Sequence, residues 1–275
     1  MVSKNINISG LRVLCVFAHP DDEGFGSGGT LAMLADKKAH ITVLCATNGD
    51  VGEISDPSLA TIATLGIVRQ HELLAAMKVT GIEDIRFLNY RDSGMAGSDE
   101  NLDCRALINA TPEDVKDRIS DIIVELRPNI IITHDPTGGY GHPDHKILCE
   151  HVTNSHRISS NKCLLYYVCF PKITFTKIWQ ELYNLGIKPP FASEDLESLG
   201  TPEDQVTTVV DVSRYVDVKI SSLNCHRTQI DPTGPFEQLP KDIMREIMST
   251  EHYALVSDTK YAKYGDTLLN LLNSA

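Results

Sequence analysis

The sequence predicts an α/β fold: a Rossmann-like, doubly wound and mostly parallel sheet with helices on both faces and an elaborated C-terminal third. Two observations predict it. Short, continuously apolar runs, typical of buried parallel strands, recur along the first two thirds of the chain. Helix-like stretches separate these runs, and the first run leads into a loop of Pro, Asp and Gly. Such alternation implies βαβ units around one sheet.

Each expected element follows from its own pattern. The strands are expected at residues 11–18, 40–46, 85–88, 129–133, 163–170 and 206–212, and the helices at 27–37, 64–80, 112–126, 143–156 and 213–228. Thr111, followed by Pro112, is a suitable cap for the third helix. The prolines and the only Trp between 171 and 205 predict an irregular insertion with one short helix, and the tail from 236 is expected to be mostly helical.

These elements predict one domain over residues 1–275. Its core spans residues 11–170, the insertion residues 171–205, and the C-terminal elements residues 206–275.

Composition limits the partners of the chain. The 275 residues include 25 Lys+Arg and 37 Asp+Glu, a formal charge of −12, which argues against binding to nucleic acid or to an anionic membrane surface. No stretch approaches the ~18–20 apolar residues of a membrane span. The seven cysteines form no C-x-x-C pair and are interpreted as reduced residues of a cytoplasmic protein.

Two polar clusters follow predicted strands, at the sheet edge where ligands bind in this fold class. They are His19-Pro20-Asp21-Asp22-Glu23 and His142-Pro143-Asp144-His145. Adjacent carboxylates repel one another unless a cation lies among them. Imidazole with carboxylate suits zinc, and neither loop contains the Cys ligands common in structural zinc sites. A catalytic metal is therefore favoured over the alternative, polar residues that only cap helices.

With Ala18, these clusters resemble the signature of the LmbE/PIG-L family of zinc-dependent deacetylases. Further matches are Thr47-Asn48-Gly49, Gly52-Glu53, Arg69 with Glu72, Leu88 to Gly94, Tyr140-Gly141, and the late Lys219, His226 and Gln229. The resemblance covers residues 11 to 230. It implies a hydrolase that removes the acetyl group from a small molecule containing N-acetylglucosamine. It does not identify the aglycone of that molecule, and it is compatible with a homo-oligomer.

The resemblance also implies a role for individual residues. Zn²⁺, or Fe²⁺ in its place, would be bound by His19, Asp22 and His145 together with water. Asp21 would be the general base that activates this water. His142 would stabilise the oxyanion or protonate the leaving amine, with Asp144 orienting its ring, and Tyr140 would lie over the substrate carbonyl.

Other residues keep two interpretations. Arg69 and Asp92 would contact sugar hydroxyls, although Arg69 has the spacing to pair with Glu72 instead. Glu23 has a direct role or is a helix-start carboxylate. The remaining assignments are that His134 and Asp135 line or stiffen the cavity, that His151 and His156 lie on the surface, and that Lys219, His226 and Gln229 serve packing.

Rival functions are weaker. Residues Gly24 to Gly29 match the dinucleotide fingerprint G-x-G-x-x-G, which would suit a nicotinamide-dependent oxidoreductase. Three preceding carboxylates would repel the pyrophosphate, and no acidic residue ends the second strand. A non-enzymatic metal or sugar-binding module has no use for Asp21, and a phosphatase usually brings more Lys and Arg. An amidase acting on thiol conjugates, as in some relatives, remains an alternative.

Overall fold

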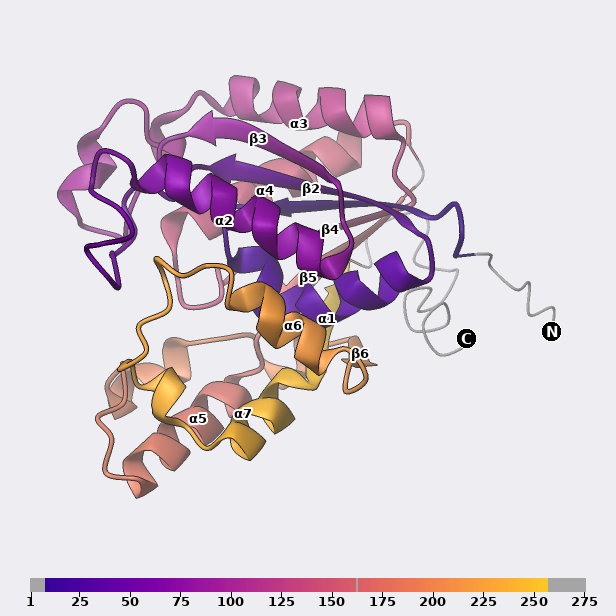
Figure 1. Cartoon of the computed structure of the whole chain (residues 1–275). Helices are drawn as coiled ribbons and strands as arrows, with labels where there is room; N and C mark the ends of the chain where they lie inside the picture. The colour runs from indigo at the N-terminus through magenta and orange to yellow at the C-terminus, as the bar shows by residue number, and fades with distance from the viewer. Residues whose placement is uncertain (1–7, 162, 257–275) are drawn as a thin grey trace, which may run out of the picture.

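The computed structural model describes residues 8–161 and 163–256, which form a seven-stranded sheet with helices packed on both sides (Figure 1). The strands are β1 (Arg12–Phe17), β2 (His40–Thr47), β3 (Asp84–Tyr90), β4 (Ile130–His134), β5 (Leu164–Cys169), β6 (Thr208–Asp211) and β7 (Thr250–Leu255). The α-helices are α1 (Asp22–Asp36), α2 (Leu65–Thr80), α3 (Pro112–Leu126), α4 (Pro143–Ile158), α5 (Lys172–Asn184), α6 (Val216–Leu223) and α7 (Lys241–Met248).

The sheet has the order β3-β2-β1-β4-β5-β7-β6. The first five strands are parallel, whereas β7 runs antiparallel to both β5 and β6. The chain moves outward from β1 to β3 and then returns to place β4 on the other side of β1. This reversal of strand order lies between β1 and β4, and it is where ligands bind in doubly wound sheets.

Two apolar cores cover the two faces of the sheet, as the predicted fold class requires. Leu31 of α1 and Leu73 of α2 pack in one core with Val13 and Phe17 of β1. On the opposite face, Leu14 and Val16 of the same strand pack against α3 and α4. Successive side chains of β1 point to opposite faces, so a strand buried on both sides becomes a continuous apolar run. The predicted α/β fold is confirmed.

Helix α1 begins at Asp22 rather than at residue 27, where the sequence predicted it. The glycines that suggested a loop lie inside the helix. A Cβ atom at Gly26 would lie 2.2 Å from Val168 Cγ1 of β5, and one at Gly29 would lie 2.5 Å from Val212 Cβ. Glycine is therefore needed for the close approach of this helix to the sheet. The segment is not the loop that a dinucleotide fingerprint requires.

The C-terminal third adds a small helical layer and a strand. Helices α5 and α7 lie beside each other in Figure 1, and Ile178 and Leu182 of α5 pack with Met244 and Ile247 of α7. The irregular segment that follows α5 contains two 3₁₀ turns, Ser193–Ser198 and Glu203–Gln205. Helix α6 is shorter than the predicted 213–228 and packs on α1 and α2.

The prediction of a mostly helical tail is half wrong. Helix α7 lies within the predicted region, but β7 follows it as an internal strand of the sheet, and residues 257–275 lie outside the described part of the chain. The sequence did not predict this strand because Glu251 places a charged residue at a position that is buried in the sheet. Its carboxylate accepts hydrogen bonds from the backbone amides of Gly29 and Thr30 at 2.8 Å and pairs with Lys219 Nζ at 2.8 Å.

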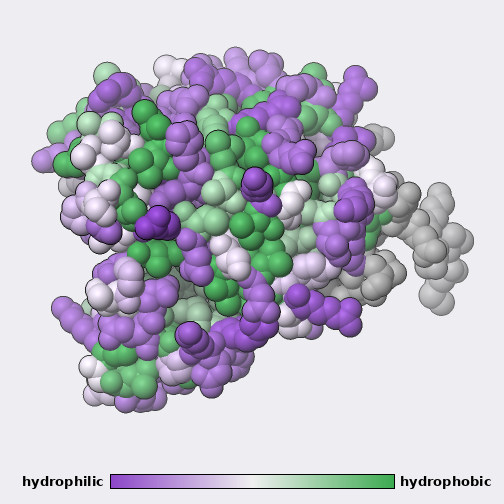
Figure 2. Space-filling model, viewed as in Figure 1, coloured by the Kyte–Doolittle hydropathy of each residue, from purple (hydrophilic) through white to green (hydrophobic). Residues whose placement is uncertain are grey.

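The face drawn in Figure 2 is mainly hydrophilic, with hydrophobic residues scattered between the polar ones. Exposed apolar side chains among the described residues include Ile67 and Leu74 on α2. Between residues 8 and 256, residue 162 aside, no helix combines the length and the apolar character needed to cross a bilayer.

Candidate metal centre

The predicted site residues gather at the carboxyl ends of β1, β3 and β4. His19, Asp21 and Asp22 lie between the end of β1 and the first turn of α1, and His142, Asp144 and His145 lie at the start of α4. The loop after β3 contributes Asp92 and Ser93. Their elements meet at the reversal of strand order, so the two clusters predicted to share a site do share one.

The three predicted metal ligands present their donor atoms to one another. His19 Nδ1 lies 3.1 Å from His145 Nε2 and 3.3 Å from Asp22 Oδ2, and His145 Nε2 lies 3.2 Å from Asp22 Oδ1. Tetrahedral ligands at about 2.0–2.1 Å from a zinc ion are about 3.3 Å apart. His19 and His145 are 5% and 3% exposed, so the donor atoms face a nearly dry centre.

The outer nitrogens of the two rings fix which nitrogen faces the centre. His145 Nδ1 lies 3.2 Å from the carbonyl oxygen of Gly138, and His19 Nε2 lies 3.2 Å from Asp144 Oδ2. A carbonyl or an ionised carboxylate only accepts, so each outer nitrogen carries the hydrogen. His145 Nε2 is then a lone-pair donor, and His19 Nδ1 becomes one when the ring of His19 is neutral, as a metal ion requires. The described residues therefore fit a divalent cation.

Two further histidines border the centre, but their hydrogen bonds make them poor ligands. His134 Nε2 lies 3.5 Å from Asp22 Oδ2, yet its lone pair accepts the backbone amide of Ala18 at 2.9 Å. His142 Nδ1 accepts the backbone amide of Asp144 at 3.2 Å, so the neutral ring keeps its hydrogen on Nε2. Burial and the neighbouring rings lower the pKa of His134 well below 6.5 and that of His142 to about 4.

Asp144 does not orient His142 through its carboxylate, as the resemblance implied. Its Oδ2 accepts from His19 Nε2 at 3.2 Å and from the backbone amide of Ser93 at 2.9 Å, and its Oδ1 accepts from the Ser93 hydroxyl. The ring of His142 is oriented by the backbone of Asp144 instead. The carboxylate lies within 4.8 Å of a ring nitrogen of His142, but its hydrogen bonds go to His19 and Ser93.

The close packing of carboxylates and imidazoles shifts the pKa values of the side chains in the centre. Burial raises the pKa of Asp22, but the rings of His145, His134 and His19 together outweigh burial and lower it well below 3.8. Burial would lower the pKa of His19, but Asp92 and the other carboxylates raise it well above 6.5. A cation that binds here must therefore displace a proton from His19, so its affinity falls as the pH falls.

Asp21 lies beside the three ligands in a strained backbone conformation. Its φ angle is 116°, in the left-handed region that favours glycine. Arg69 Nη2 donates to Asp21 Oδ2 at 3.0 Å and to the Pro20 carbonyl at 2.6 Å, and Arg69 Nη1 donates to the Gly49 carbonyl at 2.8 Å. Burial raises the pKa of Asp21 to about 6, although Arg69 opposes the shift. A carboxyl group with such a pKa is suited to proton transfer near neutral pH.

Arg69 does not pair with Glu72. Both oxygens of Glu72 accept from Thr228, its backbone amide at 2.8 Å and its hydroxyl at 2.6 Å. Arg69 is 3% exposed and engaged with Asp21, so the contact with a sugar implied by the resemblance remains a prediction.

Asp92, which is 4% exposed, and the half-exposed Tyr140 border the centre. Asp92 Oδ1 lies 3.5 Å from His19 Nε2 and 4.0 Å from His142 Nε2, and it accepts the backbone amide of Gly94 at 2.8 Å. Tyr140 is 49% exposed, and its ring meets those of His145 and His142 edge to face. An exposed aromatic ring beside buried imidazoles is well placed to contact a bound molecule.

Sequence reasoning missed or misplaced several residues around the site. Ser93, which is fully buried against Asp144, was not distinguished within its motif, because a serine 51 positions away in sequence carries no sign of this contact. His151 and His156 are 5% and 6% exposed rather than on the surface. His156 Nε2 contacts the Cys163 carbonyl at 2.9 Å, so α4 buries polar side chains as well as apolar ones.

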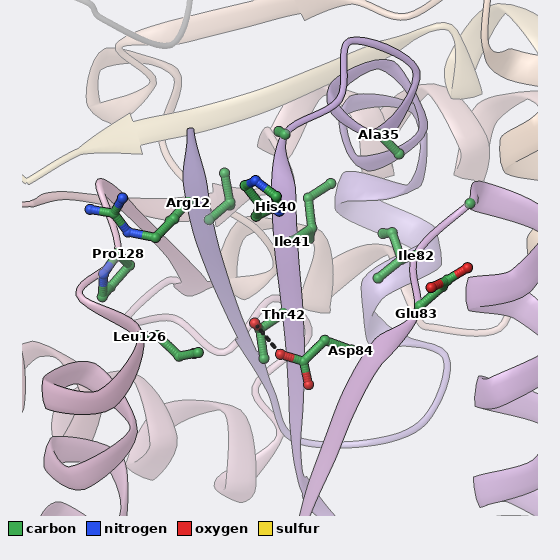
Figure 3. Close-up of a pocket in the computed structure, with 13 residues that line it drawn as sticks. Arg12, Ala35, His40, Ile41, Thr42, Ile82, Glu83, Asp84, Leu126 and Pro128 are labelled. Atoms are coloured by element: carbon green, nitrogen blue, oxygen red, sulfur yellow. Dashed lines mark hydrogen bonds between the residues drawn. The ribbon is translucent and has the colours of Figure 1, made fainter. Parts of the chain in front are cut away.

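A separate pocket of about 340 Å³ lies at the opposite edge of the sheet (Figure 3). Arg12, His40 and Asp84 line it at the amino ends of their strands, and Thr42 donates to Asp84 inside it at 2.8 Å. A smaller hollow of about 300 Å³ adjoins the metal centre, since Asp50 in its wall accepts the backbone amide of Asp92 at 3.0 Å. Ligands of doubly wound sheets bind at the carboxyl ends, which favours the second location.

Fold and site together define an α/β enzyme with a buried histidine and carboxylate cluster that can bind a metal ion. Residues 14–156 match the model of the PIG-L family, described as GlcNAc-PI de-N-acetylase. A 1D-myo-inositol 2-acetamido-2-deoxy-alpha-D-glucopyranoside deacetylase of Acidothermus cellulolyticus is 36% identical over 265 residues, covering 90% of each chain. The chain therefore belongs to the PIG-L family of deacetylases, and the predicted family is confirmed.

Solved structures extend the likeness in fold. An N,N'-diacetylchitobiose deacetylase of Pyrococcus horikoshii matches with a TM-score of 0.62 and 21% identity, over 96% of this chain and 92% of the other. The 4-carboxy-2-hydroxymuconate hydratase of Pseudomonas putida KT2440 matches with a TM-score of 0.54 and 16% identity, over 89% and 95% of the two chains. Since the same fold hosts a hydratase, the reaction must be argued from the site.

Proposed function

We propose that this protein is a metal-dependent deacetylase that hydrolyses the acetamido group of an N-acetylglucosamine-containing small molecule. The observation that supports it best is the convergence of the His19, Asp22 and His145 donor atoms at 3.1–3.3 Å, with Asp21 beside them. The curated relative from Acidothermus cellulolyticus is named for this chemistry on a glucosaminyl inositol.

The residues of the chain divide the work of amide hydrolysis. His19, Asp22 and His145 would hold Zn²⁺, with Fe²⁺ as the alternative. A bound divalent ion lowers the pKa of a coordinated water and polarises a carbonyl group. Asp21 accepts the proton of the attacking water, and Arg69 fixes the direction of its carboxylate. His142, with its hydrogen on Nε2, donates to the oxygen on which negative charge develops or to the departing amine.

We assign substrate binding to the side of the centre on which Tyr140 is exposed. Asp92 accepts from sugar hydroxyl groups, and Tyr140 covers the acetamido group. Arg69 supports the site by donating to the backbone carbonyls of Pro20 and Gly49. The hollow lined by Asn48, Asp50, Gln70 and Arg91 adjoins this side and offers both donors and acceptors to a polyol aglycone.

Asp21→Asn tests the proposal most directly. Asparagine keeps the size of the side chain and its contact with Arg69 but accepts no proton, so we expect kcat to fall by about 10²- to 10⁴-fold. The metal content of the purified protein should be unchanged. Acetate release should be measured on the glucosaminyl inositol, N,N'-diacetylchitobiose and free N-acetylglucosamine.

His145→Ala is the matched control, because it should lose both the metal and the activity. An Asp21→Asn variant that keeps its turnover contradicts the general base. A metal-loaded wild type that releases acetate from none of the three substrates contradicts the proposed activity.

A further inference from the structure

The segment of residues 226–229, which follows α6, has no role in the proposed reaction, yet it contacts three parts of the site scaffold. His226 pairs with Glu23 at the start of α1, and Thr228 donates to Glu72 on α2. Gln229 Nε2 donates to the Glu53 carbonyl at 3.0 Å in the loop after β2. His226 and Gln229, for which the sequence predicted only a packing role, therefore make hydrogen bonds to segments that surround the loop of residues 19–23.

Glu23 joins this segment to the general base. The side chains of Glu23 and His226 are each 1% exposed. Glu23 Oε1 accepts from His226 Nε2 at 2.8 Å, and Glu23 Oε2 accepts from the backbone amide of Asp21 at 2.9 Å. A single carboxylate therefore connects His226 to the backbone of Asp21 through two charge-assisted or amide hydrogen bonds.

The backbone of Asp21 needs such support. A non-glycine residue at a φ of 116° lies in a sparsely populated region and keeps that conformation only where its surroundings fix it. Arg69 fixes the side chain, whereas the Glu23 carboxylate fixes the amide. Without His226, the buried Glu23 side chain would lose the donor that fixes its Oε1, and it would then be free to turn away from the Asp21 amide.

We propose that His226 is a positioning residue that acts through Glu23 to keep the backbone of Asp21 in its strained, catalytically competent conformation. The catalytic part of this inference rests on the proposed function, because it takes Asp21 as the general base. The structural part, the connection from His226 to the Asp21 amide, is independent of the reaction.

His226→Phe tests both parts in the full-length protein loaded with zinc. Phenylalanine replaces the imidazole by another aromatic ring of similar size but offers no hydrogen-bond donor to Glu23. We expect kcat to fall by about 10- to 100-fold, the cost of misplacing a catalytic group by about an ångström, with KM within twofold and the metal content unchanged. Hydrogen exchange measured by mass spectrometry should be faster in the peptide covering residues 19–24.

Three further variants separate positioning from general destabilisation. His226→Gln restores a donor and should recover most of kcat, and Glu23→Asp, whose shorter side chain cannot reach both partners, should lose it. Ser222→Ala is the matched control on α6, because it removes another buried hydrogen bond, to the Ala76 carbonyl at 3.0 Å, without contact with Glu23. It should leave kcat and exchange at 19–24 unchanged.

A combined variant gives the decisive comparison. In the Asp21→Asn background, His226→Phe should lower kcat no further, since its effect passes through Asp21. An equal loss in both backgrounds, unchanged exchange at 19–24, or an unchanged kcat in His226→Phe each overturns the proposal. If the wild type releases no acetate, the proposed function fails alone, and the exchange measurement still decides whether His226 holds the Asp21 amide.

Discussion

At the scale of single residues, the metal centre depends on where each buried ring directs its hydrogen. His19 and His145 direct their N–H groups outward to Asp144 and to the Gly138 carbonyl, which leaves their inner nitrogens free to bind a cation. His134 accepts a backbone amide at Nε2, the nitrogen that lies near Asp22, and His142 accepts one at Nδ1, which leaves its hydrogen on Nε2. Of these four adjacent histidines, two are thereby suited to bind a cation and two are not.

Asp144→Asn should weaken metal binding without removing a ligand. Asp144 receives hydrogen bonds from the Ser93 amide, the Ser93 hydroxyl and His19, and an amide side chain has only one oxygen to accept them. We expect the affinity for Zn²⁺ to fall by about 10- to 100-fold, measured by competition with a chromophoric chelator. Ser93→Ala removes only one of the three donors, so it should lower the affinity for Zn²⁺ by less. Equal affinities of wild type and Asp144→Asn would contradict this orienting role.

The sequence indicated which side chains would meet at the centre, but not which residues hold those side chains in place. His19, Asp22 and His145 stand in two compact motifs at strand ends, and the structure brings their donor atoms together. The partners of Asp144 could not be predicted in the same way. A buried carboxylate accepts from whichever donor the loops bring near, and Ser93 comes from the loop after β3, far from Asp144 in sequence.

At the scale of elements, α1 shows why a glycine-rich stretch can be helical. Glycine disfavours a helix by about 1 kcal/mol relative to alanine, so propensity alone suggests a loop. Here the missing side chains allow α1 to approach β5 and the residues after β6, and this packing outweighs the propensity. The helix therefore starts five residues earlier than its sequence predicts, and its first turn carries Asp22 into the metal centre.

Gly26→Ala should destabilise the protein although alanine is the better helix former. The added Cβ would lie 2.2 Å from Val168 Cγ1, so β5 or α1 must shift. Overpacking of this kind costs about 1–3 kcal/mol, measured as a lower free energy of unfolding in urea. Ala75→Gly on the exposed face of α2 is the matched control and should cost only the helix propensity. A Gly26→Ala variant more stable than wild type would show that the contact relaxes freely.

Strand β7 shows the opposite limit of prediction. Its residues alternate between buried and half-exposed positions, as a strand should, but one of the buried positions is Glu251. That charge becomes acceptable only because Lys219, 32 residues earlier, lies 2.8 Å away and two backbone amides of α1 donate to it. Such compensation is a property of the folded chain, so no local pattern could reveal it.

At the scale of the whole molecule, the centre connects segments that are distant in sequence. Its proposed ligands come from the loop after β1, from the first residue of α1 and from α4, on either side of the reversal of strand order. The division of residues 1–275 into core, insertion and C-terminal elements remains a prediction, but the alternating strands and helices that form the core were predictable. Parallel strands buried on both faces are mostly apolar, so they are the part of this sequence from which structure is easiest to predict.

A cation bound across these two segments should stabilise the folded protein as a whole. The unfolded chain separates the ligands, so binding to the folded state alone adds RT ln(1 + [L]/Kd), about 4 kcal/mol when the metal is at 1,000 times its Kd. Zinc added to chelator-treated protein should therefore raise the midpoint of thermal unfolding by several degrees, measured by calorimetry. The increase should shrink as the pH falls, since His19, whose pKa is raised well above 6.5, must lose a proton before it binds. His145→Ala should show no such increase, and an equal response in that variant would place the stabilising ion elsewhere.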